Sequence, residues 1–107
     1  MKKWGDPMIR GTTPTMKFTF SEISTSDIMT AYMTIKQNGG TTIEKDLSQA
    51  EVGDGYLEWT LTQEDTLKLN ARNVVDIQLR CRTSSGAAYT SEIFESTVGD
   101  ILKDGVI

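Results

Sequence analysis

Apolar and polar residues alternate along most of this chain, and this period of two is the strongest constraint on its fold. The clearest run extends from Asn73 to Arg82. Four apolar residues fall on one face of this run (Val75, Ile77, Leu79 and Cys81) and four polar residues on the other (Asp76, Gln78, Arg80 and Arg82). Since successive side chains of a strand point to opposite faces, the run predicts a strand with one buried and one solvated face. The same pattern predicts strands over 15–20, 29–37 and 56–61, a weaker strand over 41–47, and a last long strand over 87–98.

Short turn motifs separate these runs. Asn38-Gly39-Gly40, Gly53-Asp54-Gly55 and Ser84-Ser85-Gly86 contain residues that tolerate positive φ or favour turns, which is typical of hairpins. In the last run the alternation slips at Ile93-Phe94, where two large apolar residues are adjacent. This predicts a bulge there, or a strand that is buried on both sides.

Two segments predict short helical turns. Residues 62–67 begin with Thr62 as a candidate N-cap and carry acidic residues in the first turn, where they offset the helix dipole. Asp100 is a candidate cap for a second turn over 101–103. Neither segment is long enough for the helix of a crossover connection between parallel strands.

Composition excludes several function classes. The chain has 107 residues, of which 37% are hydrophobic, so it can build one domain but not two. It has no histidine and one cysteine, which excludes His-dependent hydrolysis, imidazole metal sites and an internal disulfide. A net charge of −4 argues against a nucleic-acid partner, and no apolar run is long enough to span a membrane. The first seven residues lack the apolar run of a secretory signal. A lone cysteine suits a reducing compartment, so we expect synthesis in a cytoplasm.

The strand count and spacing predict an all-β fold. About seven short strands joined mostly by hairpins are typical of an immunoglobulin-like antiparallel β-sandwich. A single flat sheet would leave half of the apolar residues in water, so two sheets must face each other. We expect residues 1–9 to form a loose N-terminal arm, because Gly5 and Pro7 disfavour regular structure, and residues 10–107 to form the single sandwich domain.

Five motifs of this chain form a recognisable set: Arg10-Gly11-Thr12-Thr13-Pro14-Thr15, Thr34-Ile35-Lys36-Gln37-Asn38-Gly39, Leu61-Thr62-Gln63-Glu64-Asp65-Thr66-Leu67, Val75-Asp76-Ile77-Gln78-Leu79-Arg80 and Val98-Gly99-Asp100-Ile101-Leu102. Together they resemble a family of small proteins encoded among the virion structural genes of phages and prophages of Gram-positive bacteria. That family is similar in strand pattern to the immunoglobulin-like N-terminal domain of phage upper baseplate proteins. The resemblance spans residues 8–107 and implies a non-enzymatic virion protein of the tail or baseplate.

Five residues are candidate partner contacts: Trp4, Tyr32, Tyr56, Val106 and Ile107. The two tyrosines point away from their apolar neighbours, so they either mark a contact surface or are ordinary exposed strand residues. Trp4 either docks on a neighbouring subunit or folds back over the sandwich. Val106 and Ile107 end an apolar tail that can bury itself in another protomer.

Other residues that suggest chemistry have simpler explanations. Trp59 shares a face with apolar residues and is predicted to lie in the core rather than to stack on sugars. Cys81 continues the inward row of its strand, so it is predicted to act as a small hydrophobe rather than a nucleophile. Glu51, Asp54 and Glu58 could hold calcium, but their spacing matches no calcium loop. We therefore predict no catalytic residue, no metal and no cofactor.

The sequence also contains a candidate basic cluster. Lys36, Arg80 and Arg82 are predicted to form a small basic face on one sheet, for which simple solvation is the default explanation.

The predicted mechanism is assembly. Edge strands, polar sheet faces, the arm over 1–8 and the tail over 101–107 would contact copies of the same chain or other virion proteins, with no nucleic acid and no membrane as partner. The alternative is a carbohydrate- or receptor-binding sandwich, which requires an exposed aromatic cluster drawn from Trp4, Tyr32, Tyr56 and Tyr89. An enzyme would require a cleft with convergent carboxylates, and no such pair is visible in the sequence.

Overall fold

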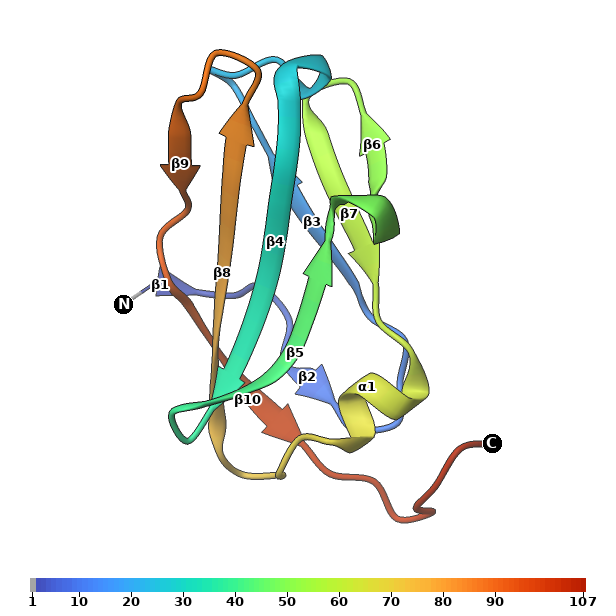
Figure 1. The fold of residues 1–107 in the computed structure, drawn as a ribbon. Helices are drawn as coiled ribbons and strands as arrows, with labels where there is room; N and C mark the ends of the chain where they lie inside the picture. The colour runs from blue at the N-terminus through green and yellow to red at the C-terminus, as the bar shows by residue number, and fades with distance from the viewer. Residues whose placement is uncertain (1) are drawn as a thin grey trace.

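The computed structural model describes residues 2–107, which form two β-sheets packed face to face (Figure 1). The large sheet follows the path β1-β10-β8-β4-β5, with β2 beside β10 and β9 beside β8, and the small sheet has the order β3-β7-β6. The strands are β1 (Lys2–Lys3), β2 (Met8–Ile9), β3 (Thr15–Thr19), β4 (Ile28–Gln37), β5 (Gly40–Asp46), β6 (Glu51–Gly53), β7 (Tyr56–Thr60), β8 (Val74–Thr83), β9 (Ala88–Thr90) and β10 (Phe94–Gly99). Short 3-10 turns, η1 (Thr25–Asp27) and η2 (Leu47–Gln49), and the helix α1 (Gln63–Leu67) complete the chain. The all-β sandwich predicted from the sequence is confirmed.

The alternating rows of the sequence form the core between the two sheets. On β8 the apolar row is buried and the polar row faces outward, and β4 repeats this arrangement. The small sheet contributes Met16, Phe18, Leu57 and Trp59. Trp59 is 1% exposed, and its indole Nε1 donates a hydrogen bond to the Asp46 carbonyl at 2.9 Å. The core position predicted for Trp59 is therefore confirmed, with its one polar atom satisfied.

The strand order leaves the β3 edge of the small sheet open, where an immunoglobulin sandwich has a further strand. An immunoglobulin sandwich places strands A, B, E and D in one sheet and C, F and G in the other. Here β3, β7 and β6 occupy the B, E and D positions, and β4, β8 and β10 occupy C, F and G. No strand within residues 2–107 occupies the A position beside β3. The N-terminal strands instead pair with β10, in parallel.

The expectation of a loose arm over residues 1–9 does not describe residues 2–9. Lys2 and Lys3 pair with β10 at Phe94 and Glu95, and Met8 pairs with it at Val98. Met8 is 2% exposed and belongs to the core. Gly5 and Pro7 do interrupt the strand, but the segments on either side are fixed by hydrogen bonds to β10 and by burial. The sandwich therefore includes most of the segment that was expected to lie outside it, and residue 1 falls outside the described residues.

The first predicted helical turn is confirmed, and the second is not formed. Thr62 caps α1: its side chain accepts a hydrogen bond from the Asp65 amide at 3.1 Å, while the Asp65 carboxylate accepts from the Thr62 amide at 2.9 Å. This reciprocal pair is a capping box. Asp100 also accepts a backbone hydrogen bond, from Ile101 at 2.8 Å, but residues 101–103 form no helical turn.

The last predicted strand is divided. β9 and β10 both pair with β8, and residues 91–93 between them leave the ladder. Thr90 opposes Arg80 and Phe94 opposes Ile77, so the β9–β10 side has one residue more than β8 over this stretch. The Ser91 side chain fills the gap by accepting a hydrogen bond from the Leu79 amide at 2.9 Å. The extra residue is the bulge that the slip at Ile93-Phe94 predicted.

Candidate interaction surfaces

A groove of about 700 Å³ opens between the two sheets on the side of β3. The β3 strand and the segment that follows it form one wall, and β9 and β10 form the other. Five aromatic residues contribute to its lining, beside charged and hydroxyl residues: Trp4, Phe18, Phe20, Tyr89 and Phe94. Within residues 2–107, β3 pairs only with β7, so the backbone groups on its outer edge face this side of the molecule unpaired.

Trp4 partly closes this groove. Its ring centroid lies 5.2 Å from that of Phe18 and 5.4 Å from that of Phe94, and Phe18 lies 6.0 Å from Trp59. The Trp4 amide donates to the Glu95 carbonyl at 2.8 Å, which fixes the backbone at this position. Of the two alternatives for Trp4, the structure shows the fold back over the sandwich. The half-buried ring still borders the groove.

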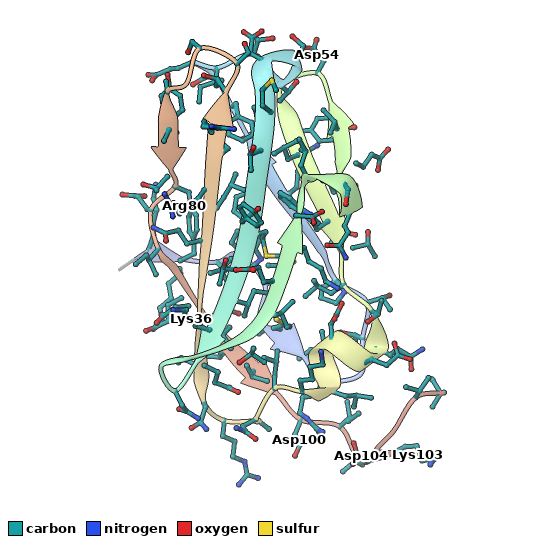
Figure 2. The ribbon with its side chains drawn as sticks, viewed as in Figure 1. Lys36, Asp54, Arg80, Asp100, Lys103 and Asp104 are labelled. Carbon is teal, nitrogen blue, oxygen red and sulfur yellow. The ribbon has the colours of Figure 1, made fainter. Side chains whose placement is uncertain are left out.

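Tyr32 lies on the outer face of the large sheet, which points away from the core, and is 45% exposed. It is the register partner of Arg80 on β8, and Thr30 is the partner of Arg82. Thr30, Tyr32, Arg80, Arg82 and Ala88 line a shallow hollow of about 210 Å³ on this face. Figure 2 shows Arg80 beside β8 and β9, while Lys36 lies near the far end of β4. The predicted basic face is therefore divided, and only its two arginines are neighbours of Tyr32.

Tyr56 lies on the outer face of the small sheet and is half-buried. The Lys17 amine sits 4.4 Å from the centre of its ring, a cation–π contact. Next to it, Glu58 pairs in register with Glu51 on β6 and with Lys17 on β3. The two candidate tyrosines thus lie on opposite faces of the sandwich and do not form one aromatic cluster.

The C-terminal tail crosses the end of the molecule that carries α1 (Figure 1). Its apolar residues are exposed: Leu102 fully, Val106 at 56% and Ile107 at 89%. The Gln63 amide holds the Ile107 backbone by two hydrogen bonds, accepting from its N–H at 2.9 Å and donating to its carbonyl at 3.3 Å. The tail is therefore held in place while its apolar side chains point into solvent.

Arg10 anchors the start of the tail. Its guanidinium binds the carboxylates of Asp100 at 3.0 Å and Asp104 at 3.3 Å, and its Nε donates to the Leu69 carbonyl at 3.0 Å. Figure 2 shows both aspartates at this end of the molecule. The hydrogen bond from the Ile101 amide and the pairing with Arg10 hold the pKa of Asp100 below its usual value. Neither Arg10 nor Gln63 stood out in the sequence, because a single long polar side chain gives no periodic signal.

The most buried ion pair joins Lys45 on β5 to Asp65 in α1, with the Lys45 amine 2.9 Å from one carboxylate oxygen. Burial by itself would raise the pKa of Asp65. The hydrogen bonds from Thr62 and Lys45 outweigh that effect, so the pKa lies below its ordinary value. The Asp65 carboxylate is bound by both Thr62 and Lys45, which identifies it as a structural group that joins α1 to β5.

Chemically reactive groups are not gathered in one place. Cys81 is 6% exposed, and burial raises the pKa of its thiol, which disfavours the reactive thiolate. Glu51 and Glu58 are register partners, but no three side chains of His, Cys, Asp or Glu come together as candidate metal ligands within residues 2–107. The calcium alternative over Glu51, Asp54 and Glu58 therefore has no shared site in this fold.

No protein-family model and no curated protein sequence matches this chain. Among residues 2–107, no helix has the length and apolar character needed to cross a membrane.

Proposed function

We propose that this protein is a non-enzymatic structural subunit of a phage or prophage virion, belonging to its tail or baseplate. It acts through assembly: the sandwich presents a strand edge, two sheet faces and an apolar tail to copies of itself or to other virion proteins. The motif resemblance described above suggests the virion, and the surfaces of the fold support a role in assembly.

The observation that carries this proposal is the open edge of β3 beside the aromatic groove. An extended segment of a partner can pair its backbone with such an edge, while its side chains enter the adjacent groove. The groove has the size to receive several side chains, and its lining combines aromatic residues with charged and hydroxyl residues. The exposed tail supports the same reading, since Leu102, Val106 and Ile107 are large apolar side chains held in solvent.

Mass spectrometry of purified particles tests the virion role. Particles are induced from a lysogen that carries the gene and purified by density, and the chain is quantified against the major tail proteins. We expect the chain at a constant ratio to those proteins, and defective or altered tails in particles from a strain that lacks the gene. If the chain is absent from intact particles, the proposal is wrong.

A carbohydrate- or receptor-binding module is the second candidate, and the aromatic lining of the groove is the observation that favours it. Trp4 and Tyr89 border the groove, and aromatic rings in a concave site are suited to stacking on sugar rings. The chain has two tryptophans, and Trp59 is 1% exposed, so a ligand in the groove would change the fluorescence of Trp4 alone. Hits on a glycan array, together with a saturable fluorescence change that is lost in Trp4→Phe, would favour this second function.

A further inference from the structure

Two faces of the sandwich each carry a pair of like charges that the chain itself leaves unneutralised. On the outer face of the large sheet, Arg80 and Arg82 point outward two positions apart on β8, which places them about 7 Å apart along the strand. On the outer face of the small sheet, Glu51 and Glu58 are direct register partners, with Cβ atoms about 5 Å apart. Like charges directly opposite each other, as in the Glu51–Glu58 pair, destabilise the sheet that carries them.

None of these four residues forms an ion pair within residues 2–107. Arg80 lies between Tyr32 and Thr90, and Arg82 between Thr30 and Ala88, so their cross-strand neighbours are uncharged. Lys17 is the register partner of Glu58, but its amine is directed over the ring of Tyr56 instead.

A third like-charged pair has a cation in contact with one of its members. Asp76 and Glu95 are register partners on β8 and β10. Lys36 on β4 is the partner of Asp76 on its other side, and the Lys3 amine lies 3.5 Å from Glu95. Glu95 therefore has a cation in contact with it, whereas Lys36 and Asp76 are register partners that form no ion pair, as are Lys17 and Glu58. Within residues 2–107 the pairs Arg80–Arg82 and Glu51–Glu58 have no contact of the Lys3–Glu95 kind.

We propose that these two pairs neutralise each other between copies of this chain: the Glu51–Glu58 face of one copy docks on the Tyr32–Arg80–Arg82 face of the next. The Cβ atoms of the two glutamates are about 5 Å apart and the two arginine positions about 7 Å apart, so their flexible side chains can meet, and each guanidinium can bind a carboxylate through two parallel hydrogen bonds. Tyr32, at 45% exposed, supplies apolar area beside the arginines.

The two faces lie on opposite sides of the sandwich, so the contact is head-to-tail. Such contacts generate a closed ring if the rotation closes, or an open stack if it does not. This inference rests on the proposed role in assembly and names its partner: a second copy of this chain.

Sedimentation velocity on the full chain tests the contact. We expect concentration-dependent association at about 0.1 M salt that is lost at about 1 M salt, where the Debye length falls from about 10 Å to about 3 Å. Two charge-reversed variants, R80E/R82E and E51R/E58R, should each weaken association by about tenfold or more. An equimolar mixture of the two should associate again, because each then offers the other a complementary face.

A matched control separates the face from net charge. Lys68 is an exposed lysine with no ion pair within residues 2–107, and it lies outside both faces and the tail. K68E changes the net charge by the same amount as the single reversal R80E, so K68E should associate like the wild type while R80E associates more weakly. Circular dichroism and the urea midpoint show that each variant is folded before it is compared.

The proposal is overturned if the wild type remains monomeric at near-millimolar concentration and low salt. In that case the arginine face would be expected to bind an acidic surface of a different protein. It is equally overturned if R80E/R82E associates like the wild type, or if the mixture stays monomeric. None of these results bears on the presence of the chain in virions, so the two proposals fail separately.

Discussion

The Lys45–Asp65 pair gives the sharpest test of how this small sandwich is held together. The Asp65 side chain is 9% exposed and the Lys45 side chain 18%, so water screens the pair only weakly. The carboxylate also accepts the Thr62 amide hydrogen bond that begins α1. Asp65→Ala removes all of these contacts at once, whereas Asp65→Asn retains an acceptor for the Thr62 amide and loses only the charge.

The two variants differ by a predictable amount. Hydrogen bonds to charged groups contribute about 1.5–3 kcal/mol each, and an N-cap interaction contributes about 1 kcal/mol. Asp65→Ala loses both the Lys45 contact and half of the capping box, so we expect the free energy of unfolding to fall by about 3 kcal/mol. Asp65→Asn should cost about half as much. For a domain of this size, 3 kcal/mol is a large share of a total of about 5–15 kcal/mol.

Urea unfolding followed by tryptophan fluorescence measures these losses, because the buried Trp59 reports on the core. A double-mutant cycle of Lys45→Met and Asp65→Asn isolates the ion pair, since methionine keeps the aliphatic part of the lysine side chain. We expect a coupling energy of about 1 kcal/mol or more. The view that this pair joins α1 to β5 would be refuted by two results together: a coupling energy near zero, and a loss of less than about 1 kcal/mol in the free energy of unfolding of Asp65→Ala.

The same group predicts a pH dependence with a definite sign. The pKa of Asp65 is lowered in the folded protein, so between that value and the ordinary value of 3.8 the unfolded chain binds more protons than the folded one. The stabilisation by Asp65 is therefore complete above the unfolded pKa and is lost as the pH falls through the folded pKa. The slope of stability against pH below about 4 should be shallower in Asp65→Asn than in the wild type. Equal slopes would contradict the assignment.

Three further predictions concern other parts of the chain. Met8→Ala should lower the free energy of unfolding by about 3 kcal/mol, because Met8 is 2% exposed; a loss below about 1 kcal/mol in urea unfolding would restore the picture of a loose arm. Gly11→Ala should cost about 1–2 kcal/mol, since φ is +74° there and the added Cβ would lie 2.8 Å from the Ile101 Cδ1 atom; an unchanged thermal midpoint would contradict this. The Cys81 thiol should react slowly with a disulfide reagent in the native protein and rapidly in urea, and equal rates would show that the thiol is accessible.

The parts of the fold that could be predicted from the sequence are those with a local signal. The burial of β8 follows from a two-residue alternation that needs no distant information. The cap of α1 follows from Thr62 and the acidic turn after it. The bulge between β9 and β10 was visible as a break in that same alternation.

The N-terminal segment could not be predicted because its partner is distant in the chain. β1 and β2 are two residues long, too short to show any period, and both pair with β10 about ninety positions away. Nothing near Met8 indicates that it will enter the core beside Val98. Gly5 and Pro7 correctly indicated a break, but a break between two short strands looks the same in sequence as an unstructured arm.

The candidate surfaces likewise include positions that the sequence predicts and positions that it does not. The outward positions of Tyr32 and of the arginines on β8 follow from strand alternation alone. Their separation from Tyr56 does not, because it depends on which sheet each strand joins. Similarly, Trp4, Phe18 and Phe94 come together only through the pairing of β1 with β10. Alternation gives the face of a strand, but it does not give that strand's neighbours.

The open edge of β3 also shows why the charged faces matter for assembly. An unpaired edge accepts any extended chain, so native proteins restrict such edges by keeping them short and by placing proline or lysine on them. β3 has five residues, follows directly after Pro14 and carries Lys17 at its centre. Backbone pairing along so short an edge cannot by itself distinguish one partner from another, since every chain has the same backbone groups. If copies of this chain assemble, the selectivity must come from side chains, and the arginine and glutamate pairs are two groups of like charges, on opposite faces, that form no ion pair within residues 2–107.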